Sequence, residues 1–350
     1  MITNLAGGLV EAGHEVDLVL AKARGEHLKA IPPGVRVIRL GSRHTFTSLL
    51  PLIRYLQREN PKALLAAKDR AIKVAVVARL LVARKPRLVG RLGTTVSAAL
   101  AGRGPLKRWL WYGGMRLFYW KTDELVAVSK GVATDIQNIT GLPESRIRVI
   151  RNPVITPLLQ ELAEAEPPHP WLREKRSPVI MGIGRLTRQK DFPTLLRAFA
   201  RLQEKRPSRL IILGEGALRP QLMELANELG IKEKIDLPGF SANPYAWLSR
   251  ADLFVLSSAW EGSPNVLTEA LALGTPAVAT DCPSGPREIL DGGRYGALVP
   301  VGDAVALATA MERTLNDPLP KAYLQRAVEQ YTVEASVRNY LGALGMTIDH

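Results

Sequence analysis

Two glutamates, Glu261 and Glu269, lie eight residues apart around the expected start of a helix. The stretch Ser257–Pro276 predicts a strand end, a glycine-proline turn and a helix, and Pro264 suits the first turn of that helix. The amides of residues 265–267 would then bind phosphate, because a helix N-terminus presents N–H groups and a partial positive charge. Beside them the two carboxylates predict a clamp for sugar and ribose hydroxyls. The alternative is two solvated glutamates, one in a loop and one on a helix.

A pair of cations follows another predicted strand, Val179–Gly184. Gly182 and Gly184 allow the backbone to approach a ligand closely, and Arg185 and Lys190 come next in the sequence. Two fixed cations at the carboxyl end of a strand would stabilise the charge on a departing diphosphate without a metal. Taken alone they are surface charges in a loop, but beside the glutamate segment we interpret them as a phosphate site.

The sequence contains no pattern typical of a metal site or of a dehydrogenase. No His, Cys, Asp or Glu cluster has metal-site spacing, and no Gly-x-Gly-x-x-Gly opens a helix after a predicted strand, which disfavours a dehydrogenase. The single cysteine, Cys282, excludes an intramolecular disulfide and indicates a reducing compartment, where a buried structural thiol is expected. We therefore expect no metal and no cofactor.

Short apolar runs alternate with amphipathic stretches along the chain, which predicts parallel sheets covered by helices. The strands expected in the first half are Glu15–Ala21, Val35–Leu40, Ala63–Ala67, Arg87–Gly93, Glu124–Ser129 and Ile147–Ile150. Those expected in the second half are Val179–Gly184, Arg209–Gly214, Ile235–Leu237, Leu253–Ser258, Ala277–Thr280 and Ala297–Val301. Each half therefore predicts a Rossmann-like unit.

A length of 350 residues suits two domains. We expect an N-terminal domain over residues 1–154, a proline-rich linker over 155–177 with one short helix at Leu158–Glu166, and a C-terminal domain over 178–332. Residues 333–350 are expected to form a helix that returns to the N-terminal domain. Two parallel sheets joined in this way would face a central cleft, where ligands bind at the carboxyl ends of the strands.

The first domain is expected to lack its first strand, because the chain opens inside an amphipathic helix with Ile2, Leu5 and Leu9 on one face. Loss of that strand would leave Glu15–Ala21 and Ala63–Ala67 with unpaired inner edges. We expect a form extended upstream in the same reading frame to be more stable and more active. The alternative is that another segment fills the gap and the short form is native.

The net charge of +14 is concentrated in the first half. Residues 1–150 contain 25 Lys and Arg and 10 Asp and Glu, whereas the remainder is nearly neutral. Such a field attracts anionic partners, although a solubilising surface would have the same composition. No nucleic-acid-binding module is recognisable, so no nucleic acid is expected. Without a signal peptide or an apolar run of about 20 residues, we expect a cytoplasmic protein with peripheral contact to anionic membrane at the inner face of the plasma membrane.

The aromatic segment Trp109–Trp120 is flanked by Lys107, Arg108 and Lys121. A basic, aromatic, amphipathic helix can lie in a membrane interface. The alternative is a core helix whose aromatic face packs on the N-terminal sheet.

The motifs together resemble the retaining family-4 glycosyltransferases from about Gly7 to Tyr340. The resemblance is strongest over Gly182–Asp191, Leu213–Gly216 and Trp260–Pro276. It continues through Thr280–Glu288, Gly296–Asp303 and the segment Val126–Pro153. It implies an α/β fold of the GT-B type and sugar transfer with retention from a UDP- or GDP-linked donor. The acceptor would be a saccharide or a lipid-linked saccharide in the synthesis of cell-surface polysaccharide or glycolipid.

The resemblance also implies roles for individual residues. Glu261 would contact the donor sugar, Glu269 the ribose hydroxyls, and Arg185 with Lys190 the diphosphate. The base would pack near Leu237–Phe240, and the donor phosphate itself would take the proton of the acceptor. The full set implied for catalysis is Glu261, Arg185 and Lys190, and the set implied for donor binding is Gly184, Gly214, Phe240, Gly262, Ser263, Pro264, Asn265, Val266, Leu267 and Glu269.

The sequence also departs from the family pattern. Where many relatives carry a histidine, this chain has Arg91–Thr95, which puts a contact to the primary hydroxyl of the sugar in doubt. No Asp-x-Asp occurs, which disfavours the metal-dependent single-domain glycosyltransferases. The alternatives are a GT-B epimerase or hydrolase acting on the nucleotide sugar, or a non-catalytic nucleotide-sugar-binding protein.

Overall fold

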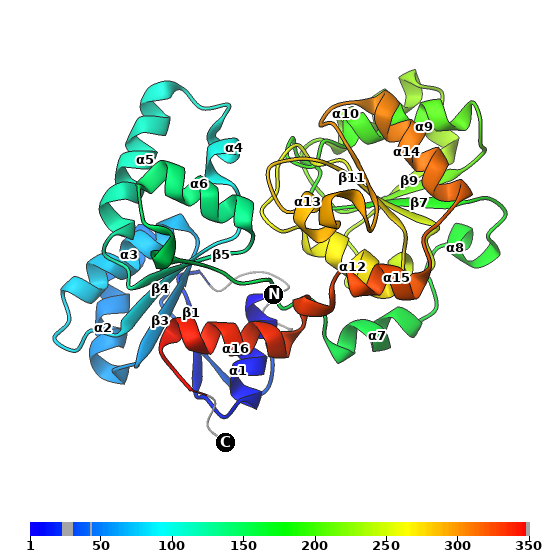
Figure 1. The fold of residues 1–350 in the computed structure, drawn as a ribbon. Helices are drawn as coiled ribbons and strands as arrows, with labels where there is room; N and C mark the ends of the chain where they lie inside the picture. The colour runs from blue at the N-terminus through cyan, green and yellow to red at the C-terminus, as the bar shows by residue number, and fades with distance from the viewer. Residues whose placement is uncertain (23–30, 43, 348–350) are drawn as a thin grey trace. The chain divides into compact units, whose positions relative to one another are not determined.

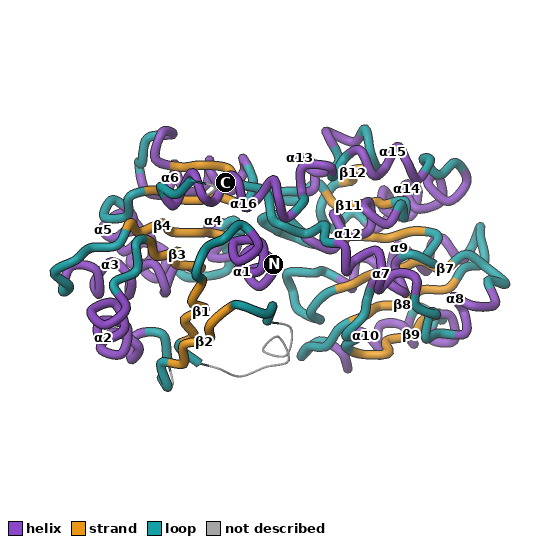
Figure 2. The backbone as a smooth tube through the Cα atoms, turned by 90° about the horizontal axis from the view of Figure 1, so that it is seen from below, coloured by secondary structure: helices purple, strands orange, loops and turns teal. Residues whose placement is uncertain are grey.

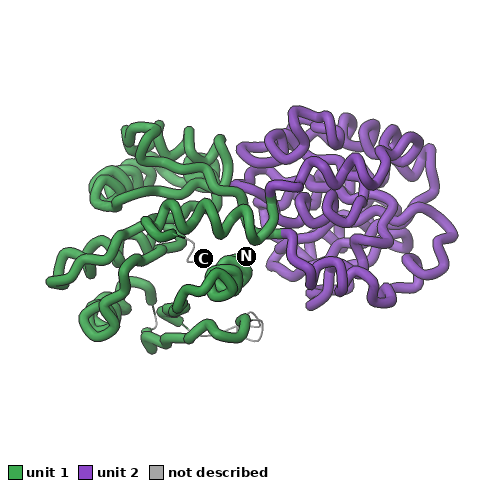
Figure 3. The backbone as a smooth tube through the Cα atoms, turned by 60° about the horizontal axis from the view of Figure 1, so that its bottom comes forward, with its two compact units in different colours: residues 1–154, 331–350 green, residues 155–330 purple. Residues whose placement is uncertain are grey.

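The computed structural model describes residues 1–22, 31–42 and 44–347. The chain forms two compact units (Figure 3). Unit 1 comprises Met1–Val154 together with Tyr331–His350, and unit 2 comprises Ile155–Gln330.

Unit 2 is a six-stranded parallel sheet with helices on both faces (Figure 1). Its strands are β7 (Val179–Ile183), β8 (Arg209–Leu213), β9 (Ile235–Gly239), β10 (Leu253–Leu256), β11 (Ala277–Thr280) and β12 (Ala297–Val299). Its helices are α7 (Pro157–Glu164), α8 (Pro170–Glu174), α9 (Phe192–Gln203), α10 (Arg219–Glu228), α11 (Tyr245–Leu248), α12 (Asn265–Leu273), α13 (Pro286–Ile289), α14 (Ala304–Asn316) and α15 (Lys321–Arg326). The strand order is β12-β11-β10-β7-β8-β9, so the direction of winding reverses between β7 and β10.

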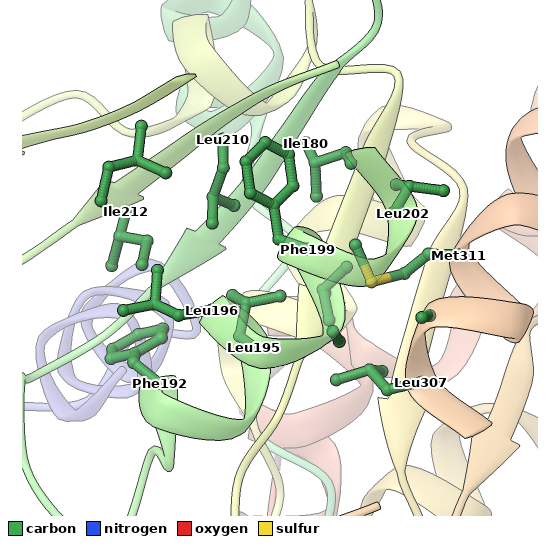
Figure 4. Close-up of a cluster of buried hydrophobic side chains, with 14 of the residues drawn as sticks. Ile180, Phe192, Leu195, Leu196, Phe199, Leu202, Leu210, Ile212, Leu307 and Met311 are labelled. Atoms are coloured by element: carbon green, nitrogen blue, oxygen red, sulfur yellow. The ribbon is translucent and has the colours of Figure 1, made fainter. Parts of the chain in front are cut away.

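The main core of unit 2 lies between this sheet and the helices α9 and α14. The apolar residues of α9 recur every three or four positions, so they share the face that turns toward the sheet. The side chains labelled in Figure 4 are Ile180, Phe192, Leu195, Leu196, Phe199, Leu202, Leu210, Ile212, Leu307 and Met311, all of them buried. This packing fixes β7 and α9, and with them the loop that joins the two.

Residues 155–177 fold onto unit 2 as two helices: α7 matches the short helix expected at Leu158–Glu166, and α8 is a second helix that was not expected. Helix α7 packs against α11, where Asn243 Nδ2 donates a hydrogen bond to the Leu162 carbonyl at 2.8 Å. In α8, Leu172 is buried with strand residues of the sheet.

Unit 1 also combines parallel strands with helices (Figure 2). Its strands are β1 (Val16–Leu20), β2 (Val35–Arg39), β3 (Ala63–Ala67), β4 (Arg87–Leu92), β5 (Glu124–Ala127) and β6 (Ile147–Val149). Its helices are α1 (Ile2–Glu11), α2 (Leu49–Glu59), α3 (Asp69–Leu80), α4 (Val96–Leu100), α5 (Pro105–Tyr119), α6 (Lys130–Thr140) and α16 (Val333–Leu344).

The strands of unit 1 form two separate sheets. Strand β1 pairs with β2, whereas β3, β4, β5 and β6 form a second sheet in that order. Shared helix layers nevertheless hold the two sheets together. Val19 of β1 and Leu64 of β3 both pack against the cluster of α2 and α3, and Val16 and Ala63 both pack against the cluster of α1 and α16. Among the described strands, the facing edges of β1 and β3 are unpaired, as the sequence predicts.

Helix α16 returns to unit 1 and completes its core. Val333, Val337 and Tyr340 pack with Leu5 and Leu9 of α1. The two helices approach closely, because a Cβ atom on Gly8 would lie 2.4 Å from Val333 Cγ1.

Helix α5 is apolar on two faces. Met115 and Tyr119 are fully buried in the core of unit 1, while Trp111, Tyr112 and Phe118 pack partly buried beside them. The opposite face carries exposed leucine and tryptophan side chains. The core-helix interpretation of this segment therefore describes only one of its faces.

Candidate active site

The reversal of winding in unit 2 places the ends of β7 and β10 side by side. Met181 of β7 is in register with Phe254 of β10, and both strands run in the same direction. In doubly wound sheets ligands bind at such a switch point, outside the carboxyl ends of the strands. The loop after β7 carries Arg185 and Lys190, and the segment after β10 carries Glu261. The topology thus brings three of the predicted side chains to one edge of one sheet.

Backbone contacts hold the loop that follows β7. The Gly184 amide donates to the Leu213 carbonyl at 2.9 Å, and the Leu186 amide donates to the Glu215 carbonyl at 2.9 Å. Arg185 is exposed between these two anchors. At the far end of the loop, Ser257 Oγ donates to the Lys190 carbonyl at 2.8 Å. The loop is therefore fixed to both β8 and β10, and its cations project from a rigid support.

Gly214 permits the close approach of this loop to the end of β8. Its φ is +134°, and a Cβ atom there would lie 2.0 Å from the Gly184 carbonyl oxygen. An alanine would therefore be strained by its own backbone and would also displace the neighbouring loop.

We expect Gly214→Ala to lower the free energy of unfolding of unit 2 by at least about 3 kcal/mol, the combined scale of backbone strain and overpacking. Gly230→Ala is the matched control. Gly230 also has a positive φ, +68°, but nothing lies within 4 Å of its Cβ position. The control should cost only about 1–2 kcal/mol. Chemical denaturation of both variants checks the difference, and equal losses would contradict the close-approach argument.

Two side chains contact Oε1 of the buried Glu261 carboxylate. Lys190 Nζ lies 2.6 Å from Glu261 Oε1, and Ser258 Oγ donates to the same oxygen at 2.7 Å. The side chains of Lys190 and Glu261 are only 16% and 10% exposed, so their interaction is weakly screened. The alternative of a solvated loop glutamate is therefore wrong for Glu261. Lys190 and Glu261 form a buried ion pair that joins the loop after β7 to the loop after β10.

The segment after β11 fixes the position of Glu261. The Glu261 amide donates to the Pro283 carbonyl at 2.7 Å, and the Ser284 amide donates back to the Glu261 carbonyl at 3.3 Å. A Cβ atom on Gly285 would lie 2.7 Å from the Gly262 carbonyl oxygen, so the two segments are in close backbone contact. Gly262 and Ser263 are buried beneath this contact.

The helix after this loop, α12, begins at Asn265 with Pro264 in the capping position. The Leu267 amide donates to the Pro264 carbonyl at 3.1 Å. We expected this amide to face a ligand, and its contact with Pro264 shows that the capping turn already uses it. The backbone amides of Asn265 and Val266 lie at the start of the helix, where its partial positive charge is largest.

Glu269 lies one turn further along α12. Part of this residue is accessible, yet burial of the carboxyl group raises its pKa to about 7, and Lys190 opposes this rise to a smaller extent. The carboxylate in turn adds to the effect of burial in raising the pKa of Tyr245 on α11. Glu269 is therefore poised between its neutral and charged forms near physiological pH.

The raised pKa predicts how stability depends on pH. The folded protein binds the Glu269 proton more tightly than the unfolded chain, so this residue lowers stability as the pH rises from about 4.5 to about 7. Glu269→Gln cannot ionise, and we expect it to be more stable than the parent at pH 8 by up to about 3 kcal/mol and equal at pH 4.5. Melting curves across this range provide the measurement. The control is the exposed Glu228→Gln on α10, and a pH-independent difference for Glu269→Gln would contradict the assignment.

Two further residues, Phe240 and Cys282, follow the carboxyl ends of strands in the sheet of unit 2. Phe240 follows β9 directly and its side chain is 64% exposed. Cys282 is buried near Glu261, and burial together with that carboxylate raises the pKa of its thiol to about 12. The thiol is therefore inert, as expected of a structural cysteine.

Arg91, the first residue of the segment Arg91–Thr95, is buried in unit 1. Its Nε donates to the Tyr340 hydroxyl at 3.0 Å, and its Nη2 donates to Asn152 Oδ1 at 2.7 Å. This side chain joins the end of β4 to α16 and has a structural role there.

The part of the chain that the structure describes has neither a metal-binding cluster nor a membrane-spanning helix. Over residues 1–22, 31–42 and 44–347, no group of three or more His, Cys, Asp or Glu side chains is placed to hold a metal ion. Among the helices of the same residues, none is both long and apolar enough to cross a membrane.

Each half of the chain matches a known family description. Residues 1–158 match the model described as Glycosyltransferase Family 4, and residues 177–317 match Glycosyl transferases group 1. A lipopolysaccharide core biosynthesis glycosyltransferase, LpsE from Rhizobium meliloti, is 33% identical over 235 residues, which are 65% of this chain and 66% of that protein. The Campylobacter jejuni N-acetylgalactosamine-N,N'-diacetylbacillosaminyl-diphospho-undecaprenol 4-alpha-N-acetylgalactosaminyltransferase is 34% identical over 60% of this chain and 56% of its own length. The chain spans about half the length of the first two curated relatives it matches.

Solved structures resemble the whole chain. Anabaena Alr3699/HepE in complex with UDP and glucose has a TM-score of 0.76 at 19% identity, covering 98% of this chain and 94% of that one. The sucrose-phosphate synthase of Thermosynechococcus elongatus has a TM-score of 0.75 at 20% identity, covering 98% and 89%. These similarities establish the two-domain α/β architecture with parallel sheets.

Proposed function

Since this chain belongs to the group 1 and family 4 glycosyltransferases and has their GT-B fold, we propose that it transfers a sugar with retention from a nucleotide-sugar donor to a saccharide or lipid-linked saccharide. The observation that carries the proposal is the buried Lys190–Glu261 pair at the switch point of unit 2. A fixed cation and a fixed carboxylate there suit the two ends of a glycosyl phosphate, its leaving diphosphate and its sugar.

In the proposed complex Lys190 and Arg185 bind the diphosphate, helped by the positive start of α12. Glu261 accepts hydrogen bonds from the hydroxyls of the sugar, and Glu269 accepts them from the ribose. Lys190 neutralises the buried Glu261 at 2.6 Å. In the proposed complex Lys190 lies between this carboxylate and the diphosphate and stabilises both anions.

The remaining donor-site residues shape the edge around these charges. Gly184 and Gly214 let two loop backbones meet at the floor of the site. The exposed Phe240 ring offers a flat apolar surface on which the base of the nucleotide can stack. Gly262, Ser263 and Pro264 set the backbone between Glu261 and α12.

In the proposed reaction the bond between the anomeric carbon and the phosphate oxygen breaks as charge develops on the diphosphate. The acceptor hydroxyl attacks the anomeric carbon from the same face, and its proton passes to the departing phosphate oxygen. Arg185 and Lys190 supply the positive charge, so the reaction as proposed requires no divalent metal.

The names of relatives support the choice of donor and acceptor. Several similar structures are described as complexes with UDP or UDP-glucose, which favours a UDP-linked donor. The Campylobacter jejuni relative is named for a diphospho-undecaprenol acceptor, and the Rhizobium meliloti relative for lipopolysaccharide core synthesis. We therefore favour a lipid-linked saccharide of the cell surface as the acceptor. The excess of positive charge over residues 1–150 supports a reaction at the cytoplasmic, anionic face of the plasma membrane.

The test begins with thermal shifts in UDP, GDP and ADP, because ligand at 100 times its dissociation constant stabilises a protein by about 2.7 kcal/mol. The UDP- or GDP-sugar selected in this way is then incubated with and without lipid-linked saccharide, in EDTA, and the product anomer is read by NMR. We expect acceptor-dependent transfer with retention. Donor consumed without acceptor would indicate an epimerase or hydrolase, and binding without turnover a binding protein. An inverted product, or activity that EDTA abolishes and manganese restores, would overturn the mechanism.

A further inference from the structure

Helix α5 carries an apolar stripe on its outer face. Leu106, Trp109, Leu110, Leu117 and Trp120 recur at spacings of three, four and seven residues, so they share one side of the helix. Leu106 and Trp109 are each 68% exposed, and Leu117 is 64% exposed. Fourteen residues of helix separate the ends of the stripe, which makes it about 20 Å long. Exposed apolar residues scattered singly are ordinary, but a contiguous row marks a binding surface.

The inner face of α5 is already committed to unit 1. Tyr119 is fully buried and its hydroxyl donates to Asp69 Oδ1 at 3.0 Å, while Arg116 Nε donates to the Ile139 carbonyl at 2.7 Å. Lys73 lies 5.3 Å from the centre of the Trp111 ring. These contacts fix the orientation of the helix, so the outer stripe is presented on a rigid support.

The charges around the stripe identify its partner. The 53 residues from Arg70 to Thr122 contain twelve Lys and Arg and no Asp or Glu. Arg103, Lys107, Arg108 and Lys121, which adjoin the stripe in the sequence, are all exposed. A second copy of this chain would bring the same positive field against itself, whereas an anionic lipid surface complements it.

The aromatic residues favour the same partner. Trp109 and Trp120 lie toward the two ends of the stripe, and tryptophan is the residue that proteins enrich at the headgroup level of a bilayer. We infer that α5 is a membrane-docking helix, which inserts Leu106, Trp109, Leu110, Leu117 and Trp120 among anionic lipids while the flanking cations contact the phosphates.

The inference rests on the proposed function in one respect. The purpose of docking is to hold unit 1 against the membrane that contains a lipid-linked acceptor. Apolar insertion and charge attraction are separate contributions, and each is tested by its own variant. Vesicle binding is measured without donor or acceptor, so its failure is distinguishable from a failure of sugar transfer.

The first experiment is cosedimentation of the whole chain with vesicles of phosphatidylglycerol and phosphatidylcholine, and with phosphatidylcholine alone. We expect binding to the anionic vesicles that weakens as salt rises, because the Debye length falls from about 10 Å at 0.1 M to about 3 Å at 1 M. The variant L106S/W109S/L110S should lose about tenfold or more in binding for each apolar side chain removed. The matched control L50S/L158S/V305S removes three similarly exposed apolar side chains from α2, α7 and α14 and should bind as the parent does.

A second measurement reports the insertion of Trp109 directly, so it does not depend on whether the triple-serine variant folds. Brominated phosphatidylcholine included in the anionic vesicles should quench tryptophan fluorescence in the parent, and Trp109→Phe should lose a large part of that quenching while it still binds. The variant K107Q/R108Q should bind anionic vesicles more weakly at low salt and match the parent at high salt.

Three results would overturn the inference. The parent could fail to sediment with anionic vesicles at low salt, or the stripe variant could bind as well as its control. The third is self-association of the parent without lipid that L106S/W109S/L110S abolishes, which would make the stripe an interface between copies of the chain.

Discussion

Lys190→Ala is expected to reduce kcat for sugar transfer by about 10²–10³-fold, the loss found when one preorganised charge contact to a transition state is removed. The lysine faces the buried Glu261 carboxylate at 2.6 Å and is also proposed to bind the leaving diphosphate. Its removal therefore takes away charge stabilisation and leaves a buried carboxylate without its cation, which costs about 3–5 kcal/mol of stability. Steady-state kinetics and melting curves measure the two effects separately.

The control for this variant is Arg188→Ala, which removes an exposed cation from the same loop and should leave kcat nearly unchanged. The double variant Lys190→Ala with Glu261→Gln should recover much of the lost stability, because no unpaired charge remains buried, but it should not recover activity. If Lys190→Ala turned over like the parent, the ion pair would have only a structural role.

Glu261→Gln is expected to lower kcat by a similar factor of about 10²–10³ while nucleotide affinity changes only a few-fold. The amide has nearly the shape of the carboxylate but no charge, so the sugar loses a strong hydrogen-bond acceptor while the diphosphate and ribose contacts remain. Isothermal titration with UDP and GDP, together with turnover of the matching nucleotide sugar, separates binding from catalysis.

The exposed Glu233→Gln provides a control for the loss of one negative charge in unit 2. A Glu261→Gln variant that lost nucleotide binding in proportion to turnover would place Glu261 at the nucleotide rather than at the sugar. An unchanged kcat in this variant would show that Glu261 takes no part in sugar transfer.

The strands were predictable because most of them are short apolar runs between longer amphipathic stretches. Every predicted strand appears, and most differ only at their ends, as at Arg87–Leu92. Within 155–177, the helix expected at Leu158–Glu166 appears as α7 (Pro157–Glu164), whereas α8 (Pro170–Glu174) was not expected, because its proline was interpreted as a helix breaker. Pro157 and Pro170 both occupy first helical turns, after Thr156 and His169, whose side chains accept hydrogen bonds from the helix amides. Proline at that position starts a helix.

The candidate site was predictable as a list of residues but not as an arrangement. Spacing placed Arg185 and Lys190 after one strand and Glu261 after another, and the strand order made those strands neighbours. The Lys190–Glu261 contact joins residues 71 positions apart, and no local pattern encodes it. Ser258 was passed over although it lies three residues before Glu261. The hydrogen bond from the Leu267 amide to the Pro264 carbonyl was likewise not predictable, because it depends on the conformation of the turn at Pro264.

The return of α16 to unit 1 has a consequence for synthesis on the ribosome. Unit 2 is continuous in sequence, whereas the core of unit 1 needs Val333, Val337 and Tyr340, which follow unit 2 in the chain. At about 5–20 residues per second, the 176 residues of unit 2 delay α16 by roughly 10–35 s after Val154 is made. Unit 2 can therefore fold during that interval, while the cores that α1, β3 and β4 share with α16 stay open. In this protein the half that is synthesised first is completed last.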